Sequence, residues 1–192
     1  FSPQGQSVWA HLQSLGEYLS RHITKVHNRL DWNIAAFLTW CSPIGFRLPE
    51  ETEVQRGWIN TLALGDTETG KSKVVKALKK TFNCGSYVSG ENCTYVGLIG
   101  GLIKSASGQF MLRWGHIPLQ DKQLVVLEEM SSLSITDIAN MSDVRSSGIA
   151  RIDKGGISSE TTARTRLICL ANVRQVKKNL AHYLFGVHAV QD

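Results

Sequence analysis

The stretch "GDTETGKS" (residues 65–72) fits the phosphate-binding pattern G-x-x-x-x-G-K-[S/T]. It follows the apolar run "WINTLAL" (58–64), which predicts a β-strand. It precedes "SKVVKALKKTF", in which Val74, Val75 and Leu78 share one helical face. A strand, a glycine-rich loop and a helix in this order form the local structure in which the pattern binds phosphate. The alternative, a chance match in a glycine-containing turn, leaves the flanking strand and helix unexplained.

The residue types of this loop suit a nucleotide with Mg²⁺. Successive backbone N–H groups and the start of the following helix attract phosphate oxygens. Lys71 would reach the β- and γ-phosphates, and the Ser72 hydroxyl would ligate Mg²⁺. Glu68 is unusual there, because a carboxylate repels phosphate unless it faces solvent. We therefore predict an ATP–Mg²⁺ site whose nucleotide-binding residues are Gly65, Asp66, Thr67, Glu68, Thr69, Gly70, Lys71 and Ser72.

Two later segments predict further strands of the same sheet. "QLVVLEEM" (123–130) and "RLICLAN" (166–172) are short continuous apolar runs that end in polar residues. Such runs are typical of central parallel strands covered on both faces. Three buried strands of this kind predict an open α/β sheet with its ligand site along the carboxyl edge.

Acidic and amide side chains end these two strands. Glu128 and Glu129 follow the first, and we expect Glu128 to hold the metal ion and Glu129 to polarise the attacking water. Aspartate is the usual residue at the metal-holding position of such a strand end, and the Glu128 side chain is one methylene longer. Asn172 ends the second strand, where its amide could orient that water or sense the γ-phosphate. The catalytic candidates are therefore Lys71, Glu129 and Asn172, although a solvated strand end and a turn asparagine are the simpler alternatives.

Two β-hairpins are predicted between the strands. "LIKSASGQFMLRWG" (102–115) has two extended arms around a Ser-Gly turn. "GIARIDKGGISSETT" (148–162) forms the second, with residues 153–156 at its tip.

The chain before the core is predicted to be helical. Val8, Leu12, Leu15, Tyr18 and Leu19 recur at three-to-four-residue spacing, which predicts an amphipathic helix. A second helix is expected over residues 31–40, and "CSPIGFRLPEETEVQRG" (41–57) is expected to be a connecting loop. The basic and then apolar tail (174–192) also predicts a helix.

Composition sets wider limits. With 192 residues and 42% hydrophobic content, one compact domain is expected. The net charge of +5 would suit an anionic partner. The four cysteines form neither a C-x-x-C pair nor a zinc pattern, which favours a reducing, intracellular location. No apolar run reaches the roughly 18 residues of a membrane span, and no two histidines stand at i, i+4. The sequence thus predicts neither a secreted protein nor a membrane protein.

The order of these elements resembles the AAA+ ATPases and, more narrowly, the minichromosome maintenance (MCM) helicases. "RGWIN" with "LALGDTETGKS" is similar to the family's entry into its Walker A loop, and "LVVLEEM" is similar to its Walker B strand. The most specific stretch is "GIARIDKGGISSETTARTRLICLAN", in which Lys154, the pair Ala163-Arg164, and Asn172 fall on the family's hairpin lysine, Ala-Arg pair and sensor-1 asparagine. Val173 departs from the family, which usually has proline there.

The resemblance implies a P-loop NTPase fold of the AAA+ type: a three-layer α/β/α core with a parallel sheet, two β-hairpin inserts and an N-terminal helical segment. The helical segment would span residues 1–55 and the ATPase core 56–192, cut before the family's arginine finger and helical lid. In the family, both hairpins project into the channel of a hexameric ring and grip single-stranded DNA. Lys154, and more weakly Lys104 and Arg113, would then contact DNA.

The function implied is the motor core of an MCM-like DNA helicase that is either nuclear or cytoplasmic and associated with the nucleoid. An arginine finger contributes about 10³ to 10⁵ in related phosphoryl transfers, so weak hydrolysis is expected of the isolated chain. The first alternative is an AAA+ protein remodeller of the magnesium-chelatase or enhancer-binding activator type, although "SASGQF" (105–110) is a poor match to the activators' loop. The second is a nucleotide-binding switch with weak catalysis, suggested by Glu68 and Glu128.

Overall fold

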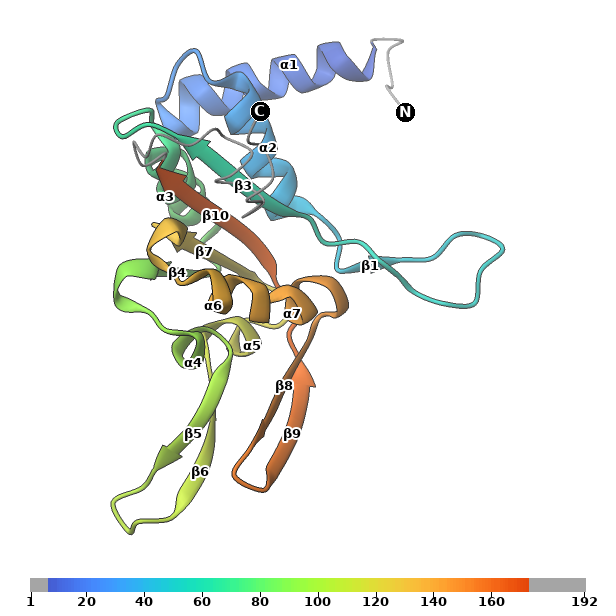
Figure 1. Cartoon of the computed structure of the whole chain (residues 1–192). Helices are drawn as coiled ribbons and strands as arrows, with labels where there is room; N and C mark the ends of the chain where they lie inside the picture. The colour runs from blue at the N-terminus through green and yellow to red at the C-terminus, as the bar shows by residue number, and fades with distance from the viewer. Residues whose placement is uncertain (1–6, 173–192) are drawn as a thin grey trace, which may run out of the picture.

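A parallel β-sheet between two layers of helices forms the core of the protein (Figure 1). The computed structural model describes residues 7–172. The sheet is four-stranded, and its strands in spatial order are β3 (Asn60–Gly65), β10 (Arg166–Asn172), β7 (Leu124–Glu128) and β4 (Ser86–Ser89). This arrangement confirms the predicted three-layer α/β fold of a P-loop NTPase.

The central strands are the ones with the longest apolar runs. β10 pairs in parallel with both β3 and β7, and the side chains of β7 and β10 are almost all buried. β4 was not predicted, because it has four residues and begins and ends with serine. β3 was expected to be buried, but it is the edge of the sheet within the described residues, and Leu62 is 46% exposed. An edge strand has a neighbour on one side only, which explains the difference.

The first helical layer contains both N-terminal helices and the helix of the glycine loop. Its elements are α1 (Val8–Tyr18), the π-helix η1 (Leu19–Thr24), α2 (Leu30–Cys41) and α3 (Lys71–Phe82). Val74, Val75 and Leu78 of α3 are fully buried against Ile168 and Leu170 of β10, as their spacing predicted. The predicted helix over residues 174–192 lies outside the described residues.

The apolar face predicted for α1 is only partly buried. Leu19 is buried, but Val8 is 66% exposed and Tyr18 is 57% exposed. α1 runs beyond the sheet and contacts α2 near its own carboxyl end, where Gly16 lies against Ile34 (Figure 1). Periodicity identified the helix, but only its packing decides how much of the face is covered.

The second helical layer is made of short helices. They are the 3₁₀ turns η2 (Gly90–Asn92) and η3 (Met130–Ser132) and the α-helices α4 (Tyr95–Leu98), α5 (His116–Leu119), α6 (Ile135–Asn140) and α7 (Ser142–Ser147). Their buried side chains, such as Leu98, Ile117 and Val144, pack on the face of β7 and β10 opposite α3. Between residues 7 and 172, none of the helices is both long and apolar enough to cross a bilayer.

Two β-hairpins project side by side from one end of the core (Figure 1). The first pairs β5 (Gly100–Lys104) with β6 (Phe110–Trp114), and the second pairs β8 (Ile149–Lys154) with β9 (Ile157–Thr162). Both were predicted. Gly155 and Gly156 have positive φ values and make the turn beside Lys154. A Cβ on Gly155 would lie 3.3 Å from Leu102 Cδ1, so the second hairpin's tip leans on the first hairpin.

The segment expected to be a plain connecting loop forms a third projection. β1 (Gly45–Phe46) and β2 (Gln55–Arg56) pair through two residues each, and we call residues 45–56 the arm. The arm extends from the amino end of β3, away from the body of the molecule (Figure 1). The prolines and glycines correctly indicated a loop. A ladder of two residues is too short to be recognised in the sequence from alternating apolar and polar residues.

An ion pair fastens the second hairpin to the core. Arg164, just after β9, donates to Asp121 through its backbone N–H (2.7 Å), its Nε (3.2 Å) and its Nη2 (2.9 Å). Partial burial raises the pKa of Asp121, but the hydrogen bonds from Arg164 lower it by more. The pKa of this carboxyl therefore lies below its usual value.

Asp121→Asn should lower the free energy of unfolding by about 1 kcal/mol at pH 7, allowing for solvent screening of a partly exposed pair. In the folded protein the pKa of Asp121 lies below its unfolded-state value of about 3.9. The ion pair therefore contributes its full stabilisation of the fold at pH values above that unfolded-state pKa. Its contribution is lost as the pH falls through the folded pKa. Urea unfolding at pH 7 and pH 3 should show the difference between mutant and wild type narrowing at pH 3.

The matched control is Glu160→Gln, since Glu160 forms an ion pair with Arg151 (3.3 Å) in which both side chains are more than half exposed. It should change the unfolding free energy little at either pH. If the unfolding free energy lost in Asp121→Asn were the same at pH 7 and pH 3, the lowered pKa assigned to Asp121 would be wrong.

Candidate nucleotide-binding site

The carboxyl edge of the sheet brings the predicted site residues together. Asn172 is in register with Gly65 on the neighbouring strand, and Glu128 ends the strand on the other side of β10. A cavity of about 380 Å³ opens at this edge. It is lined by Thr67, Glu68, Thr69, Gly70, Lys71, Ser72, Lys73, Glu129 and Asn172.

The glycine loop has the backbone shape that its sequence suggested. Gly70 has φ +84°, which favours glycine, and it caps the amino end of α3. A Cβ on Gly70 would also lie 2.9 Å from Val26 Cγ1, so α3 begins close to the segment after η1. Glu68 likewise has a positive φ, and its side chain is exposed at the cavity rim. The exposed position allows its carboxylate to turn toward solvent.

Lys71 is held by the loop itself. Its Nζ donates to the carbonyl oxygens of Gly65 (2.8 Å) and Asp66 (2.5 Å) and to Thr69 Oγ1 (3.2 Å). Burial lowers the pKa of Lys71, while the charges of Glu129 and Asp66 raise it by less. The ammonium group lines the cavity and is bound there by neutral oxygen acceptors, which an anionic phosphate can replace.

Glu128 lies in a cluster from three elements. Lys76 of α3 approaches its Oε2 (3.7 Å), and Lys76 Nζ also lies 5.1 Å from the ring centroid of Tyr87 on β4. Burial raises the pKa of Glu128, but the neighbouring hydroxyls of Ser72 and Tyr87 and the Lys76 charge lower it by more. Burial and Glu128 raise the pKa of the Tyr87 hydroxyl. Glu128 is therefore held as a carboxylate beside Ser72.

These residues fit a magnesium ion. Mg²⁺ is usually held by one or two protein oxygens, phosphate oxygens and water rather than by a cage of protein ligands. Ser72 and Glu128 supply two such oxygens, and the buried Tyr87 hydroxyl beside them forms no well-aligned hydrogen bond. Among residues 7–172 no cluster of three or more His, Cys, Asp or Glu side chains could hold a metal alone.

Glu129 and Asn172 also line this cavity. Asn172 Nδ2 donates to Glu129 Oε1 at 2.7 Å. Glu129 has φ +52°, a left-handed conformation that costs a non-glycine residue of order 1 kcal/mol. A Cβ on Gly90 would lie 2.6 Å from the Glu129 carbonyl oxygen, so the turn after β4 closely fits this unusual backbone. No local sequence signal pointed to Gly90, because the contact is tertiary.

A second cavity, which sequence reasoning missed, adjoins the glycine loop. It has a volume of about 400 Å³ and shares Gly65 and Thr69 with the loop. Trp32 of α2 lines it, and the Trp32 indole N–H donates to the Lys71 carbonyl oxygen at 3.2 Å. The N-terminal helices thus build part of the site. Trp32 appeared in the sequence only as an apolar residue of a predicted helix.

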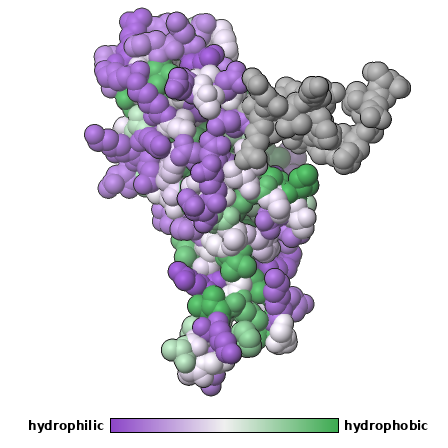
Figure 2. All heavy atoms as spheres, turned by 60° about the vertical axis from the view of Figure 1, so that its left-hand side comes forward, coloured by the Kyte–Doolittle hydropathy of each residue, from purple (hydrophilic) through white to green (hydrophobic). Residues whose placement is uncertain are grey.

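The predicted DNA-contacting residues lie elsewhere. Lys104, Arg113 and Lys154 are exposed on the two hairpins, which leave the core at the end away from the glycine loop (Figure 1). Figure 2 shows apolar side chains among polar ones on this hairpin end, and Phe110 and Met111 of β6 are 64% and 50% exposed. The structure therefore separates a nucleotide cavity from a projecting surface that carries both cationic and aromatic side chains.

Comparison with known proteins identifies relatives of the chain. The model of the MCM P-loop domain matches residues 13–183. DNA replication licensing factor mcm5 of Dictyostelium discoideum is 29% identical over 127 residues, which are 66% of this chain and 17% of the relative. The MCM5 protein of Arabidopsis thaliana is 31% identical over 65% of this chain and 17% of its own length. DNA replication licensing factor mcm2 of Schizosaccharomyces pombe is 30% identical over 61% of this chain and 14% of its own length. The chain thus spans about a sixth of the length of these relatives.

Proposed function

Because this chain belongs to the MCM P-loop domain family, we propose that it is the ATP-hydrolysing motor core of a DNA helicase, in which hydrolysis drives movement along single-stranded DNA. The observation that supports this most is the cavity shared by the glycine loop, Glu129 and Asn172. Relatives named as DNA replication licensing factors favour this function over a protein remodeller.

The proposed nucleotide contacts follow from the cavity. Backbone N–H groups of the loop and the ammonium of Lys71 bind the phosphates, and Lys71 exchanges its loop carbonyls for phosphate oxygens. Ser72 and Glu128 would hold Mg²⁺, and the bound ion would neutralise charge on the phosphate oxygens. The cavity lined by Trp32 takes the base and ribose, because its surface is mostly apolar and it directly adjoins the loop.

The proposed hydrolytic groups are Glu129 and Asn172. Glu129 accepts a proton from the attacking water, and Asn172 fixes the position of the Glu129 carboxylate through the hydrogen bond between them. A carboxylate that already has a hydrogen-bond donor is oriented before the substrate arrives. Asn172 acts here through Glu129, so that its loss should lower turnover without removing nucleotide binding.

The hairpins are the proposed DNA-binding elements. Lys154 lies beside two glycines at a turn, so its ammonium can reach a phosphate of the DNA backbone. Lys104 is in register with the exposed Phe110 on the first hairpin, and a cation beside an exposed ring suits single-stranded nucleic acid. By analogy with the family, several copies would form a hexameric ring with the hairpins lining its channel. Such a motor would work at the chromosome, in a nucleus or a nucleoid.

The test is ATP hydrolysis by the natural protein that carries this chain, with and without single-stranded DNA, comparing wild type with Lys154→Ala. Stimulation by DNA should be present in wild type and lost in the mutant, while hydrolysis without DNA stays unchanged. The matched control is Lys122→Ala, an exposed lysine outside the hairpins. If neither DNA nor the Lys154→Ala change altered the rate of hydrolysis, a protein remodeller would be favoured. No hydrolysis at all would favour a nucleotide-binding switch.

A further inference from the structure

We propose that the arm (residues 45–56) of one copy docks on a basic face of a second copy, so that copies of the chain associate head to tail. We define the basic face by the exposed side chains of His22, Lys25, His27, Lys73 and Lys80 on η1, the segment after it and α3. This inference names the contact surfaces of the assembly in the proposed function. It rests on that function for the identity of the partner as another copy.

The arm has the properties of an unpartnered binding element. Every residue from 46 to 56 is exposed, and only a two-residue ladder holds the arm together. A lone two-stranded ribbon is marginally stable in water. Phe46, Leu48 and Val54 are 46%, 47% and 62% exposed, so the arm presents three large apolar side chains close together in sequence. An exposed apolar cluster of this kind on a projecting element marks a contact surface.

The arm's tip is acidic. Residues 48–54 include Glu50, Glu51 and Glu53 and contain no Lys or Arg. Glu51 accepts a hydrogen bond from Gln55 (2.8 Å), and among the described residues no cation lies within ion-pair distance of Glu50 or Glu53. The charge and exposed side chains of the tip therefore suit a partner surface that is cationic and partly apolar.

The basic face supplies the complementary chemistry. Within the part of the chain that the structure describes, no carboxylate lies within ion-pair distance of Lys25, Lys73 or Lys80. Lys73 and Lys25 are adjacent, because Lys73 Nζ lies 3.4 Å from the Lys25 carbonyl oxygen. The exposed ring of Tyr18 packs against His22 in a tilted arrangement, with ring centroids 4.7 Å apart and an interplanar angle of 35°. This ring pair gives the face an apolar area for side chains such as Phe46.

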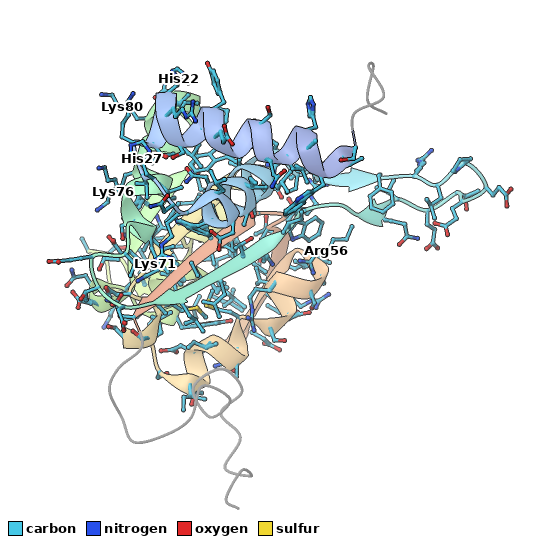
Figure 3. All side chains as sticks on the ribbon, turned by 90° about the horizontal axis from the view of Figure 1, so that it is seen from above. His22, His27, Arg56, Lys71, Lys76 and Lys80 are labelled. Carbon is cyan, nitrogen blue, oxygen red and sulfur yellow. The ribbon has the colours of Figure 1, made fainter. Side chains whose placement is uncertain are left out.

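The two surfaces lie at opposite ends of the molecule. In Figure 3 the labelled side chains of His22, His27 and Lys80 are at one end, and the arm extends from the other. The arm leaves the amino end of β3, whereas the glycine loop and the basic face lie at its carboxyl end. An arm therefore cannot reach its own basic face. Contact between two different surfaces is heterologous and closes into a ring or continues as a filament.

Nucleic acid is the other anionic partner that a basic face could bind. It would neutralise the lysines but leave Phe46, Leu48 and Val54 of the arm uncovered. A second copy would cover the apolar side chains of the arm and pair with the lysines of the basic face. It would also place the neighbour's arm beside the loop that holds Lys71. The observations therefore favour a second copy.

The test is a charge exchange, measured by sedimentation equilibrium of the whole chain at low ionic strength without nucleotide. Glu50→Lys with Glu53→Lys reverses the arm, and Lys25→Glu with Lys80→Glu reverses the basic face. Each double variant should associate at least tenfold more weakly than the unmodified chain, because two attractive charge pairs become repulsive. An equal mixture of the two variants should recover association, since each then finds an opposite charge. Glu160→Lys, a reversal on the exposed face of β9, should leave association unchanged.

Association that both reversals leave intact, or a mixture that does not recover it, would overturn the inference. So would an unmodified chain that stays monomeric at concentrations on the order of 100 μM. Loss of single-stranded oligonucleotide binding in the Lys25 and Lys80 variant, with association unchanged, would assign the face to nucleic acid instead. Nucleotide binding is measured separately, and Lys71→Ala should keep the association while binding ATP more weakly. Failure of this inference and failure of the proposed function are thereby distinguished.

Discussion

Lys71→Ala should weaken ATP binding to this chain by about 10- to 100-fold. The Lys71 ammonium is the cationic side chain that the glycine loop holds at the cavity through two carbonyl oxygens and Thr69. A hydrogen bond between charged groups contributes about 1.5–3 kcal/mol, which corresponds to this loss of affinity. Equilibrium titration with a fluorescent ATP analogue measures it directly.

The matched control for Lys71→Ala is Lys79→Ala on the same helix, because Lys79 lies two turns away and does not line the cavity. Its affinity for nucleotide should stay within about twofold of wild type. Since Lys71 also ties the loop together, thermal unfolding of both mutants should be compared. An ATP affinity that Lys71→Ala leaves unchanged, in a folded protein, would remove the glycine loop from the nucleotide site.

Glu129→Gln should lower the rate of ATP hydrolysis by about 10²-fold or more and leave ATP affinity nearly unchanged, because general-base catalysis contributes roughly 10²–10⁴. Glutamine keeps an oxygen that can accept the hydrogen bond from Asn172, so the wall of the cavity is preserved while the base is lost. The measurement is single-turnover hydrolysis by the natural protein that carries this chain.

Glu128→Gln separates the two neighbouring carboxylates. Glu128 lies by Ser72 and Lys76, whereas Glu129 lies by Asn172, so each has its own surroundings. We expect Glu128→Gln to raise the Mg²⁺ concentration needed for ATP binding, and Glu129→Gln to leave that requirement as in wild type. If the two mutants exchanged these effects, the roles of the two carboxylates would be reversed.

Much of the fold could be predicted because its central elements have strong local patterns. β7 and β10 are continuous apolar runs, α3 has a regular buried face, and the turns of both hairpins contain glycine. β4 and the arm were missed, since elements of four and two residues are shorter than the periods by which strands are recognised.

The grouping of candidate site residues at the sheet edge could be predicted, because the order of parallel strands along the chain decides which residues meet there. Residues at the carboxyl ends of neighbouring strands must meet, which is why Glu129 and Asn172 lie together with the loop. Trp32, Tyr87 and Gly90 could not be found in this way, because their roles depend on tertiary contacts with Lys71, Glu128 and Glu129. The left-handed backbone of Glu129 is likewise set by its surroundings rather than by its residue type.

The contact between Trp32 and the glycine loop supplies a built-in optical probe. The half-buried indole donates to the backbone of Lys71, so a change in the loop alters the polarity and hydrogen bonding around that ring. Trp40 and Trp58 are buried, Trp9 lies near the start of α1, and Trp114 lies on β6 of the first hairpin, which leaves Trp32 as the indole on the cavity wall among the described residues. The intrinsic emission of the protein can therefore follow the loop in time, without a label, as nucleotide enters and leaves.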